Sequence, residues 1–403
     1  MTSSKMIIMS KFILFTKDNR IYSNSLQIID QFFEAGITVG ILAKQSTLDV
    51  LRSQIPEQYE KEEKIQLLPR GNDDLKAEIR KLRRSDAIIS ILGFVQEDAI
   101  FSFNCKIPLF NPQPMVEKES DINIDSKVID YGLPILDFQD IIDCYKAFDI
   151  NKDSYFKFEE SDKFSVISIN NANTMGMNRD EEEIRIKKIF ETNLKADSHS
   201  REQIVLLCLL FQLIHKVVSD KQFDSVEFWG TFPSSTYGKV DTSASFLKEA
   251  IRWIVGGNPR AKKGVPTEIF IRHSSMKSKH SSGSCRLSNK CDRDFDTLIL
   301  NPVLKGKLVG KVVCIIDDYI TNGYSAEAAK HILFQAGVSR VIFLSMGKFG
   351  YKYFQTNYQI NGDVTSAPYP FDFEGEKELG RNSTGISYNQ NNDKGILEFG
   401  ELF

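Results

Sequence analysis

The chain has 403 residues, of which 41% are hydrophobic, and its formal net charge is −3. This length predicts two or three domains, each with enough apolar residues to form a core. The small net charge gives no general attraction to nucleic acids or to anionic membranes, so we expect neither as a partner.

The sequence carries no signal for secretion or for a membrane span. The longest apolar stretch, residues 204–218, contains Gln212, His215 and Lys216 and is too short to cross a bilayer. The beginning of the chain lacks the continuous apolar region and the cleavage site of a signal peptide. The six cysteines are scattered and several lie in apolar runs, which is typical of reduced thiols. We therefore expect a soluble, cytoplasmic protein.

Residues 1–145 alternate between short apolar runs and helix-like segments. The runs, which we predict to be strands, are residues 12–15, 37–42, 65–68, 87–92 and 107–110. The segments that we predict to be helices are residues 25–35, 47–55, 73–84 and 97–103. Such alternation is typical of βαβ units and a parallel sheet, so we expect one Rossmann-like domain here.

The rest of the chain predicts a connector, a second domain and a tail. Residues 146–200 are polar and are expected to form a connector with one solvated helix. Residues 201–365 alternate again, with predicted strands at 226–229, 268–272, 312–316 and 341–346 and helices at 201–218, 246–255 and 326–336. Residues 366–403 are rich in Gly, Asn, Ser and acids, which indicates a poorly ordered or docked tail.

The most informative stretch is residues 311–325, where the predicted strand ends in Asp317 and Asp318. A turn containing Thr321 and Gly323 follows and leads through Ser325 into a predicted helix. Open α/β sheets bind phosphorylated ligands at the carboxyl ends of their strands, and a helix N-terminus attracts the phosphate. The two carboxylates can accept hydrogen bonds from sugar hydroxyls. The stretch therefore predicts a site for a ribose 5-phosphate.

This stretch resembles the motif with which type I phosphoribosyltransferases bind 5-phosphoribosyl 1-pyrophosphate (PRPP), although Asn322 and Ser325 replace two threonines. The resemblance implies two α/β domains with mostly parallel sheets flanked by helices, the second of them phosphoribosyltransferase-like. It implies that Asp317 and Asp318 act as the catalytic pair that binds the ribose hydroxyls. The residues implied for the 5-phosphate are Thr321, Asn322, Gly323, Tyr324 and Ser325. An ordinary strand, turn and helix is the alternative.

A second anion site is predicted after the strand at residues 226–229. Small hydroxyl residues in a loop can present backbone N–H groups to an anion. The resemblance implies that this loop binds pyrophosphate, with a simple surface turn as the alternative. The residues implied are Pro233, Ser234, Ser235 and Thr236. Mg²⁺ is expected on the pyrophosphate of PRPP and not on a side chain, since this cation prefers oxygen ligands and phosphates.

Residues 272–294 have no regular pattern and are rich in cations, which is typical of a mobile lid. We expect Arg272 and Arg286 to neutralise the pyrophosphate, because positive charge is most useful where negative charge develops. Type I enzymes close a flexible loop over the site, and this segment resembles their competence-associated ComF branch. A nucleic-acid-binding loop is one alternative. A zinc site is another, with His273, His280, Cys285 and Cys291 as its ligands.

The first predicted strand leads into Thr16 and Asp18, a stretch that resembles the opening motif of haloacid-dehalogenase-like (HAD) phosphatases. Thr16 stands where those enzymes have their nucleophilic aspartate, and a threonine cannot form the aspartyl-phosphate intermediate. We therefore expect an inactive HAD-like domain that binds a protein partner. A plain Rossmann-like interaction domain is the alternative.

The combined prediction is a phosphoribosyltransferase that binds PRPP and Mg²⁺ and transfers ribose 5-phosphate to or from a nucleobase or nucleotide. Phe349, Tyr351 and Tyr353 are candidates for stacking on the base, with core packing as their alternative role. The other functional hypothesis is a non-catalytic PRPP-sensing or scaffolding subunit. Fusion to an inactive partner is similar to effectors of bacterial antiphage systems such as retrons. We also expect an oligomer.

Overall fold

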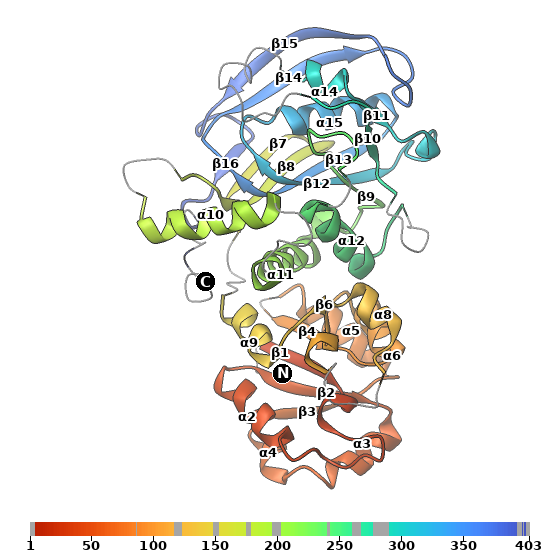
Figure 1. Cartoon of the computed structure of the whole chain (residues 1–403), viewed down its shortest axis with the longest axis vertical. Helices are drawn as coiled ribbons and strands as arrows, with labels where there is room; N and C mark the ends of the chain where they lie inside the picture. The colour runs from red at the N-terminus through yellow and green to blue at the C-terminus, as the bar shows by residue number, and fades with distance from the viewer. Residues whose placement is uncertain are drawn as a thin grey trace.

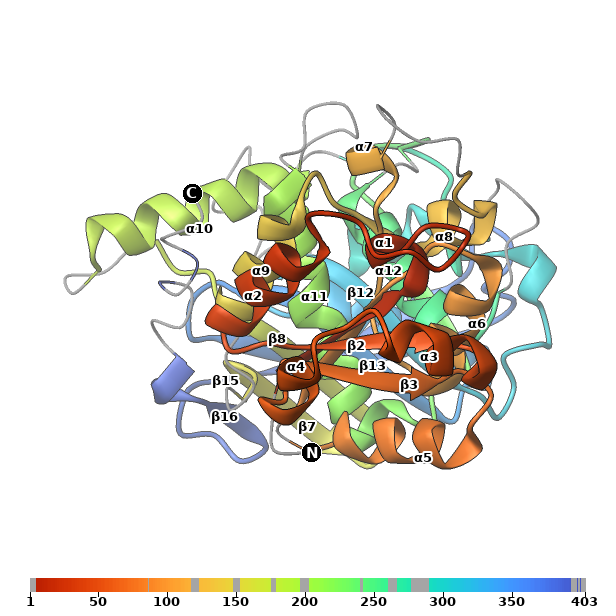
Figure 2. The same cartoon turned by 90° about the horizontal axis from the view of Figure 1, so that it is seen from below.

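The computed structural model describes residues 5–85, 87–116, 123–147, 153–174, 179–195, 203–239, 242–259, 267–276 and 290–392, together with 397 and 399. The chain forms two α/β units that follow one another along the long axis of the molecule (Figure 1). Helices α11 (Gln203–Ser219) and α12 (Ser243–Val255) lie between the two sheets. Viewed along that axis, strands of the first sheet lie in front of strands of the second (Figure 2).

The first sheet has six strands, all parallel, in the order β3-β2-β1-β4-β5-β6. The strands are β1 (Lys5–Ser10), β2 (Thr38–Ala43), β3 (Ile65–Pro69), β4 (Ile88–Leu92), β5 (Leu109–Asn111) and β6 (Leu133–Pro134). The strands β2 and β4 are buried along their whole length, as expected when helices cover both faces. The predicted parallel α/β architecture is confirmed for this unit.

Helices connect these strands. They are α1 (Lys11–Leu14), α2 (Ser25–Glu34), α3 (Gln45–Arg52), α4 (Glu57–Lys61), α5 (Asp73–Leu82), α6 (Gln96–Cys105), α7 (Gln113–Val116), α8 (Ser126–Tyr131) and α9 (Phe138–Ala147). The strand order reverses direction between β1 and β4, which is the place where open α/β sheets usually bind ligands.

The prediction of a first strand at residues 12–15 is wrong. The strand is β1, whose apolar residues are 0–2% exposed between β2 and β4, and residues 11–14 form helix α1. Thr16 and Asp18 lie beyond that helix, in a turn closed by a hydrogen bond from Thr16 N to Arg20 O of 2.8 Å. Thr16 therefore does not follow a strand, and the correspondence with the HAD motif does not hold in this register.

The second sheet has the order β16-β7-β8-β13-β12-β9. Its strands are β7 (Phe156–Ser161), β8 (Phe164–Asn171), β9 (Phe228–Thr231), β12 (Val312–Ile320), β13 (Arg340–Lys348) and β16 (Ile386–Tyr388). The four strands from β8 to β9 are parallel, whereas β7 runs antiparallel to both of its neighbours, β8 and β16. Side chains along β12 and β13 alternate between two hydrophobic cores. One core includes α11 and α12, and the other includes α15 (Tyr324–Gln335).

Two segments contribute more structure than their composition predicted. Residues 146–200 were expected to be a connector with one helix, and they contain α10 (Glu181–Lys195) but also the β7–β8 hairpin. The predicted tail contains β16 and β15 (Phe371–Leu379), which pairs with β14 (Tyr353–Ile360). The charged turn at 159–163 hid the hairpin, because it interrupts two runs that are otherwise alternating and apolar.

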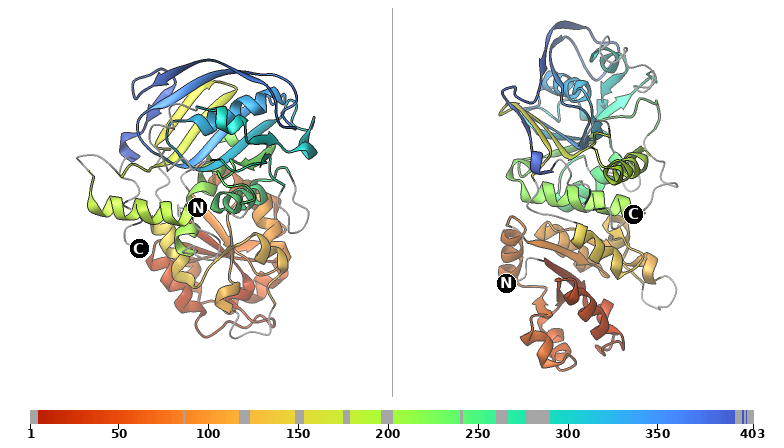
Figure 3. Two further views of the ribbon diagram at one scale, coloured as in Figure 1. Left: turned by 45° about the horizontal axis from the view of Figure 1, so that its top comes forward. Right: turned by 90° about the vertical axis from the view of Figure 1, so that its left-hand side faces the viewer.

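The two units share an apolar contact through α11 and α12. The ring of Phe110 in β5 stacks on Phe211 in α11 at 6.1 Å, and Tyr131 stacks on Trp253 in α12 at 3.6 Å. These helices form the layer between the two units in both views of Figure 3. Among the described residues, no helix combines the length and apolar composition that a bilayer crossing requires.

Candidate ligand-binding site

A cavity of about 330 Å³ opens at the carboxyl edge of the second sheet. Thr231 of β9 lies beside Ile316 of β12 in the parallel register, so the segments after these two positions meet at one edge. The lining residues come from the end of α10, the loop after β9, the start of α12, α14 (Asp292–Phe295) and the end of β12. They are Leu194, Lys195, Phe232, Pro233, Ser234, Ser235, Lys239, Thr242, Ala244, Met276, Arg293, residues 317–325 and Phe349.

The two predicted carboxylates line this cavity from within strand β12, which is longer than predicted. Asp318 N donates to Asp317 Oδ1 at 2.9 Å, and Tyr319 N donates to Asp318 Oδ1 at 2.6 Å. These bonds to the backbone orient both carboxylates. A carboxylate offers about four acceptor positions, so each has capacity for further hydroxyl donors.

The predicted phosphate turn, residues 321–325, also lines the cavity in full. Gly323 has φ 88°, and a Cβ atom on it would lie 2.4 Å from Cε2 of Tyr353, so only glycine fits the turn. In the described part of the chain no side chain caps the start of α15. Since residues 323–325 line the cavity, the positive end of this helix faces it, as an anion site requires.

The predicted pyrophosphate loop is only partly at the cavity. Pro233, Ser234 and Ser235 line it, whereas Thr236 does not. Arg286 lies outside the described residues, as do residues 277–289 of the predicted lid.

The prediction that Arg272 binds the ligand is corrected by its contacts. Its side chain is 2% exposed and pairs with Asp294 at 3.1 Å, and it is not among the residues that line the cavity. It donates to the carbonyl oxygens of Ser234 at 2.6 Å and Pro233 at 3.4 Å. Arg272 therefore supports the loop from behind, since its donors are used within the protein.

Arg293 is a cavity residue that the sequence analysis did not single out. Its Nε is buried and has no hydrogen-bond partner in the part of the chain that the structure describes. The guanidinium forms paired hydrogen bonds with phosphates, so an arginine with unused donors in a cavity is suited to an anion. In the sequence Arg293 was one of six cations in an irregular segment, and only the fold separates it from the others.

Apolar and aromatic side chains form another wall of the cavity. Phe349 and Leu194 line it, so the candidate role of Phe349 as a stacking residue is compatible with its position. Tyr351 lies outside the lining, where its ring contacts the Arg381 guanidinium at 3.6 Å. Tyr353 is completely buried against the turn, so it is a packing residue.

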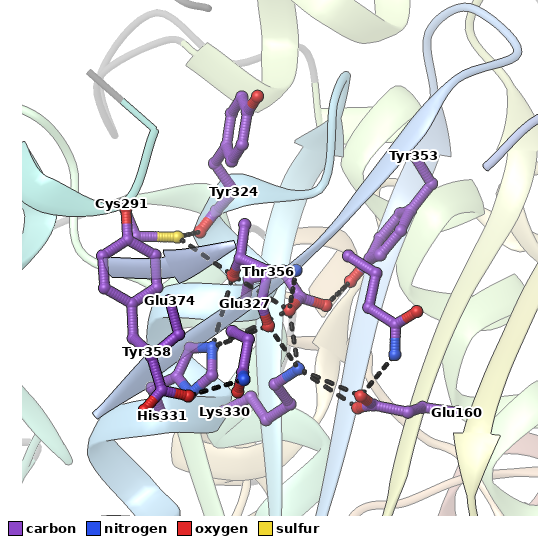
Figure 4. A network of polar contacts seen from close by, with 12 residues as sticks. Glu160, Cys291, Tyr324, Glu327, Lys330, His331, Tyr353, Thr356, Tyr358 and Glu374 are labelled. Atoms are coloured by element: carbon purple, nitrogen blue, oxygen red, sulfur yellow. Dashed lines mark hydrogen bonds and ion pairs between the residues drawn. The ribbon is translucent and has the colours of Figure 1, made fainter. Parts of the chain in front are cut away.

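Behind the turn, the buried face of α15 is held by a polar network (Figure 4). The carboxylate of Glu327 accepts hydrogen bonds from Tyr353 OH at 2.6 Å, Lys330 Nζ at 2.6 Å and Thr356 N at 2.9 Å. Burial raises the pKa of Glu327, while these donors oppose that shift. Burial lowers the pKa of His331 to about 3, so this histidine is neutral. The network fixes the helix that starts at the predicted phosphate turn.

The zinc alternative has no support in the described residues. Burial raises the pKa of Cys291 well above its usual value, and its Sγ lies 3.4 Å from the carbonyl oxygen of Tyr324. His280 and Cys285 lie outside the described part of the chain. Within that part, no three His, Cys, Asp or Glu side chains gather as a metal site would require.

Comparisons with known proteins do not identify a family. No protein-family model and no curated protein matches the chain. One solved structure, described as a GsuK channel bound to NAD, is similar at 10% identity with a TM-score of 0.20. The match covers 85% of this chain and 61% of that chain. A similarity this weak supports neither a shared fold nor a shared function.

Proposed function

We propose that the cavity binds PRPP and that the protein is a phosphoribosyltransferase acting on a nucleobase or nucleotide. The observation that carries this proposal is the meeting of two separate segments in one cavity. Residues 233–235 and 317–325, each predicted from the sequence to bind one part of PRPP, line the same space. The cavity also has an aromatic wall in Phe349 against which a flat base can lie.

Each part of the ligand has residues suited to it. The ribose hydroxyls donate to Asp317 and Asp318, and the 5-phosphate lies at the N-terminus of α15. The pyrophosphate lies between the loop at 233–235 and the guanidinium of Arg293. When bound through the pyrophosphate oxygens, Mg²⁺ neutralises part of the leaving-group charge.

During the transfer, the residues of the cavity hold the ligand in place and stabilise the charges that develop on it. As the bond from the anomeric carbon to pyrophosphate breaks, positive charge develops on the sugar and negative charge on the leaving group. The carboxylates of Asp317 and Asp318 stabilise the first, and Arg293 stabilises the second. The apolar wall keeps water away from the anomeric carbon while the acceptor nitrogen attacks it.

A second candidate is a PRPP sensor without turnover. Helix α12 contributes Thr242 and Ala244 near the cavity, and further along it Trp253 stacks on Tyr131 of the first unit. A ligand in the cavity therefore contacts the layer that joins the two units. The expected protein partner of the first unit, the oligomer and the antiphage role remain predictions.

Release of pyrophosphate from PRPP and Mg²⁺ with a panel of nucleobases tests the proposal. Turnover with one acceptor, lost in an Asp317→Asn/Asp318→Asn variant, supports the transferase. PRPP binding without turnover on any acceptor favours the sensor. Absence of both binding and turnover contradicts both candidates.

A further inference from the structure

A buried lysine joins the phosphate turn to the loop that follows β13. Lys348 is the last residue of β13, lies beside Ile320 in the parallel register and has no exposed surface. Its Nζ donates to the carbonyl oxygens of Thr321 at 2.6 Å, Phe349 at 2.7 Å, Lys352 at 3.0 Å and Gly350 at 3.3 Å. One ammonium group thus gathers four carbonyl oxygens from two loops.

The turn itself explains why a lysine is needed. The three successive carbonyls of residues 320–322 are bound by residues between 348 and 354. Ile320 O accepts from Phe349 N at 2.8 Å, and Asn322 O accepts from Phe354 N at 2.9 Å. Between them Thr321 O accepts from the side chain of Lys348. Without that side chain, the Thr321 carbonyl would lose this bond, and an unpaired buried acceptor costs about 1–3 kcal/mol.

The charge of Lys348 has no carboxylate partner among the described residues. Within the described residues its Nζ is surrounded by carbonyl oxygens and by the ring of Phe156 at 5.4 Å. Burial lowers the pKa of Lys348 to about 7, while four carbonyl acceptors favour the protonated form. A buried cation is costly unless an anion compensates it, and the turn beside it is the proposed phosphate site.

We propose that Lys348 is a positioning residue for the phosphate group: its ammonium holds Thr321 in place and supplies the buried positive charge that a phosphate in the turn compensates. This inference rests on the proposed function, because it takes the turn to be the phosphate site. The loop after β13 has further anchors, since Gly350 N donates to Asn173 Oδ1 and Arg179 Nη2 lies 3.2 Å from the Tyr351 hydroxyl. Loss of Lys348 therefore affects the turn more than that loop.

The first experiment compares Lys348→Met with Lys352→Met. Lys352 is a neighbouring lysine, but its side chain is 62% exposed and pairs with Glu378 at the surface. Calorimetry with ribose 5-phosphate should show about tenfold weaker binding in Lys348→Met, because the turn loses its anchor at Thr321 and the buried positive charge, and no change in Lys352→Met. Hydrogen exchange of residues 320–325 without ligand should become faster only in Lys348→Met. Should that variant fail to fold, Lys348→Gln keeps hydrogen-bond donors without the charge.

The second experiment separates charge from packing. Lys348→Ala removes three carbon atoms and the ammonium nitrogen, which together have the size and shape of propylammonium. 1-Propanol has nearly the same shape but carries no charge. We expect propylammonium to restore ribose 5-phosphate affinity and 1-propanol not to restore it. The inference about Lys348 would be overturned if both compounds restored the ribose 5-phosphate affinity equally. It would also be overturned if folded Lys348→Met and Lys348→Gln bound ribose 5-phosphate as tightly as the wild-type protein, and neither result would affect the proposed function. Absence of ribose 5-phosphate and PRPP binding in the wild-type protein would instead overturn the proposed function.

Discussion

The two units differ in the surroundings of the carboxylates near the C-terminal ends of their strands. In the first unit Asp98 is completely buried, pairs with Arg70 at 2.6 Å and accepts hydrogen bonds from Phe94 N and Val95 N at the start of α6. In the second unit Asp317 and Asp318 line a cavity of about 330 Å³. The carboxylate at the first edge is used within the protein, whereas the two at the second edge line a cavity.

This difference shows which feature of an α/β fold indicates a ligand site. Both sheets have the architecture that places ligands at carboxyl strand ends, but architecture alone does not assign a site. At α6 the carboxylate of Asp98 lies where an anion would bind to the helix N-terminus. At α15 no described side chain takes that position. This difference is the reason why we propose the ligand site in the second unit.

Among these variants, Asp98→Ala in the first unit should cause the largest loss in the free energy of unfolding. The change leaves Arg70 partly buried without its partner and removes an acceptor from two amides, so we expect a loss of about 3–5 kcal/mol in the free energy of unfolding. Urea denaturation measures it, with Asp73→Ala, whose side chain is 92% exposed, as the control with almost no effect. PRPP affinity should stay unchanged. Loss of PRPP binding in a folded Asp98→Ala protein would contradict the assignment of the two edges.

Gly323→Ala in the second unit should cause the next largest destabilisation. The change adds strain at φ 88° and places Cβ against the ring of Tyr353, for which we expect about 2–4 kcal/mol of destabilisation. Gly306→Ala is the matched control, because Gly306 has φ 74° with no atom within 4 Å of the added Cβ, and it should cost about 1 kcal/mol. Thermal unfolding compares them. Equal costs would mean that the Tyr353 contact does not shape the turn.

Arg293→Met should affect one end of the ligand only. Its guanidinium is expected to bind pyrophosphate, so pyrophosphate affinity should fall about tenfold while ribose 5-phosphate affinity stays constant. Lys305→Met, at an exposed ion pair with Asp363, is the control. A parallel loss of affinity for both ligands would show that Arg293 acts on the whole cavity and not on the pyrophosphate.

The last prediction concerns the stability of the protein in acid. Burial lowers the pKa of His215 in α11 from 6.5 to about 4 and that of His331 in α15 from 6.5 to about 3. Between these values and 6.5 the unfolded chain binds protons that the native protein does not, so stability is full above pH 6.5 and decreases as pH falls. Each histidine contributes at most about 1.4 kcal/mol per pH unit. His331→Gln and His215→Gln should flatten this decrease in urea titrations at pH 7 and pH 5, each by its own share.

Local patterns of the sequence indicated several of the residues that line the cavity of the second unit. The acid pair and the turn at 321–325 form one continuous segment, so their order along the chain already indicates the chemistry. The roles of Arg272 and Arg293 could not be separated in this way, because both are cations of the same irregular segment. The ion pair with Asp294 and the hydrogen bonds to the carbonyl oxygens of Ser234 and Pro233 show that Arg272 is used inside the protein.

The fold was predictable where helices and strands alternate clearly, and less so at its edges. The first strand was misplaced because residues 6–9 and 12–15 are both apolar, and pairing with β2 and β4 selects the former. The β7–β8 hairpin depends on β13, a partner far along the chain, whereas β15 pairs with the preceding strand β14 within a segment whose composition indicated a tail. Lys348 had no sequence signal, since its role comes from four carbonyl oxygens that meet only in the folded protein.

The most direct test of the central claim is calorimetric titration of PRPP with Mg²⁺ into the wild-type protein and into Asp317→Asn/Asp318→Asn. Both side chains line the cavity without belonging to the fully buried core, so the variant should fold normally. We predict binding by the wild-type protein and at least about a hundredfold weaker binding by the variant, since it loses several hydrogen bonds to charged acceptors. Equal affinity of the two proteins for PRPP would contradict the account.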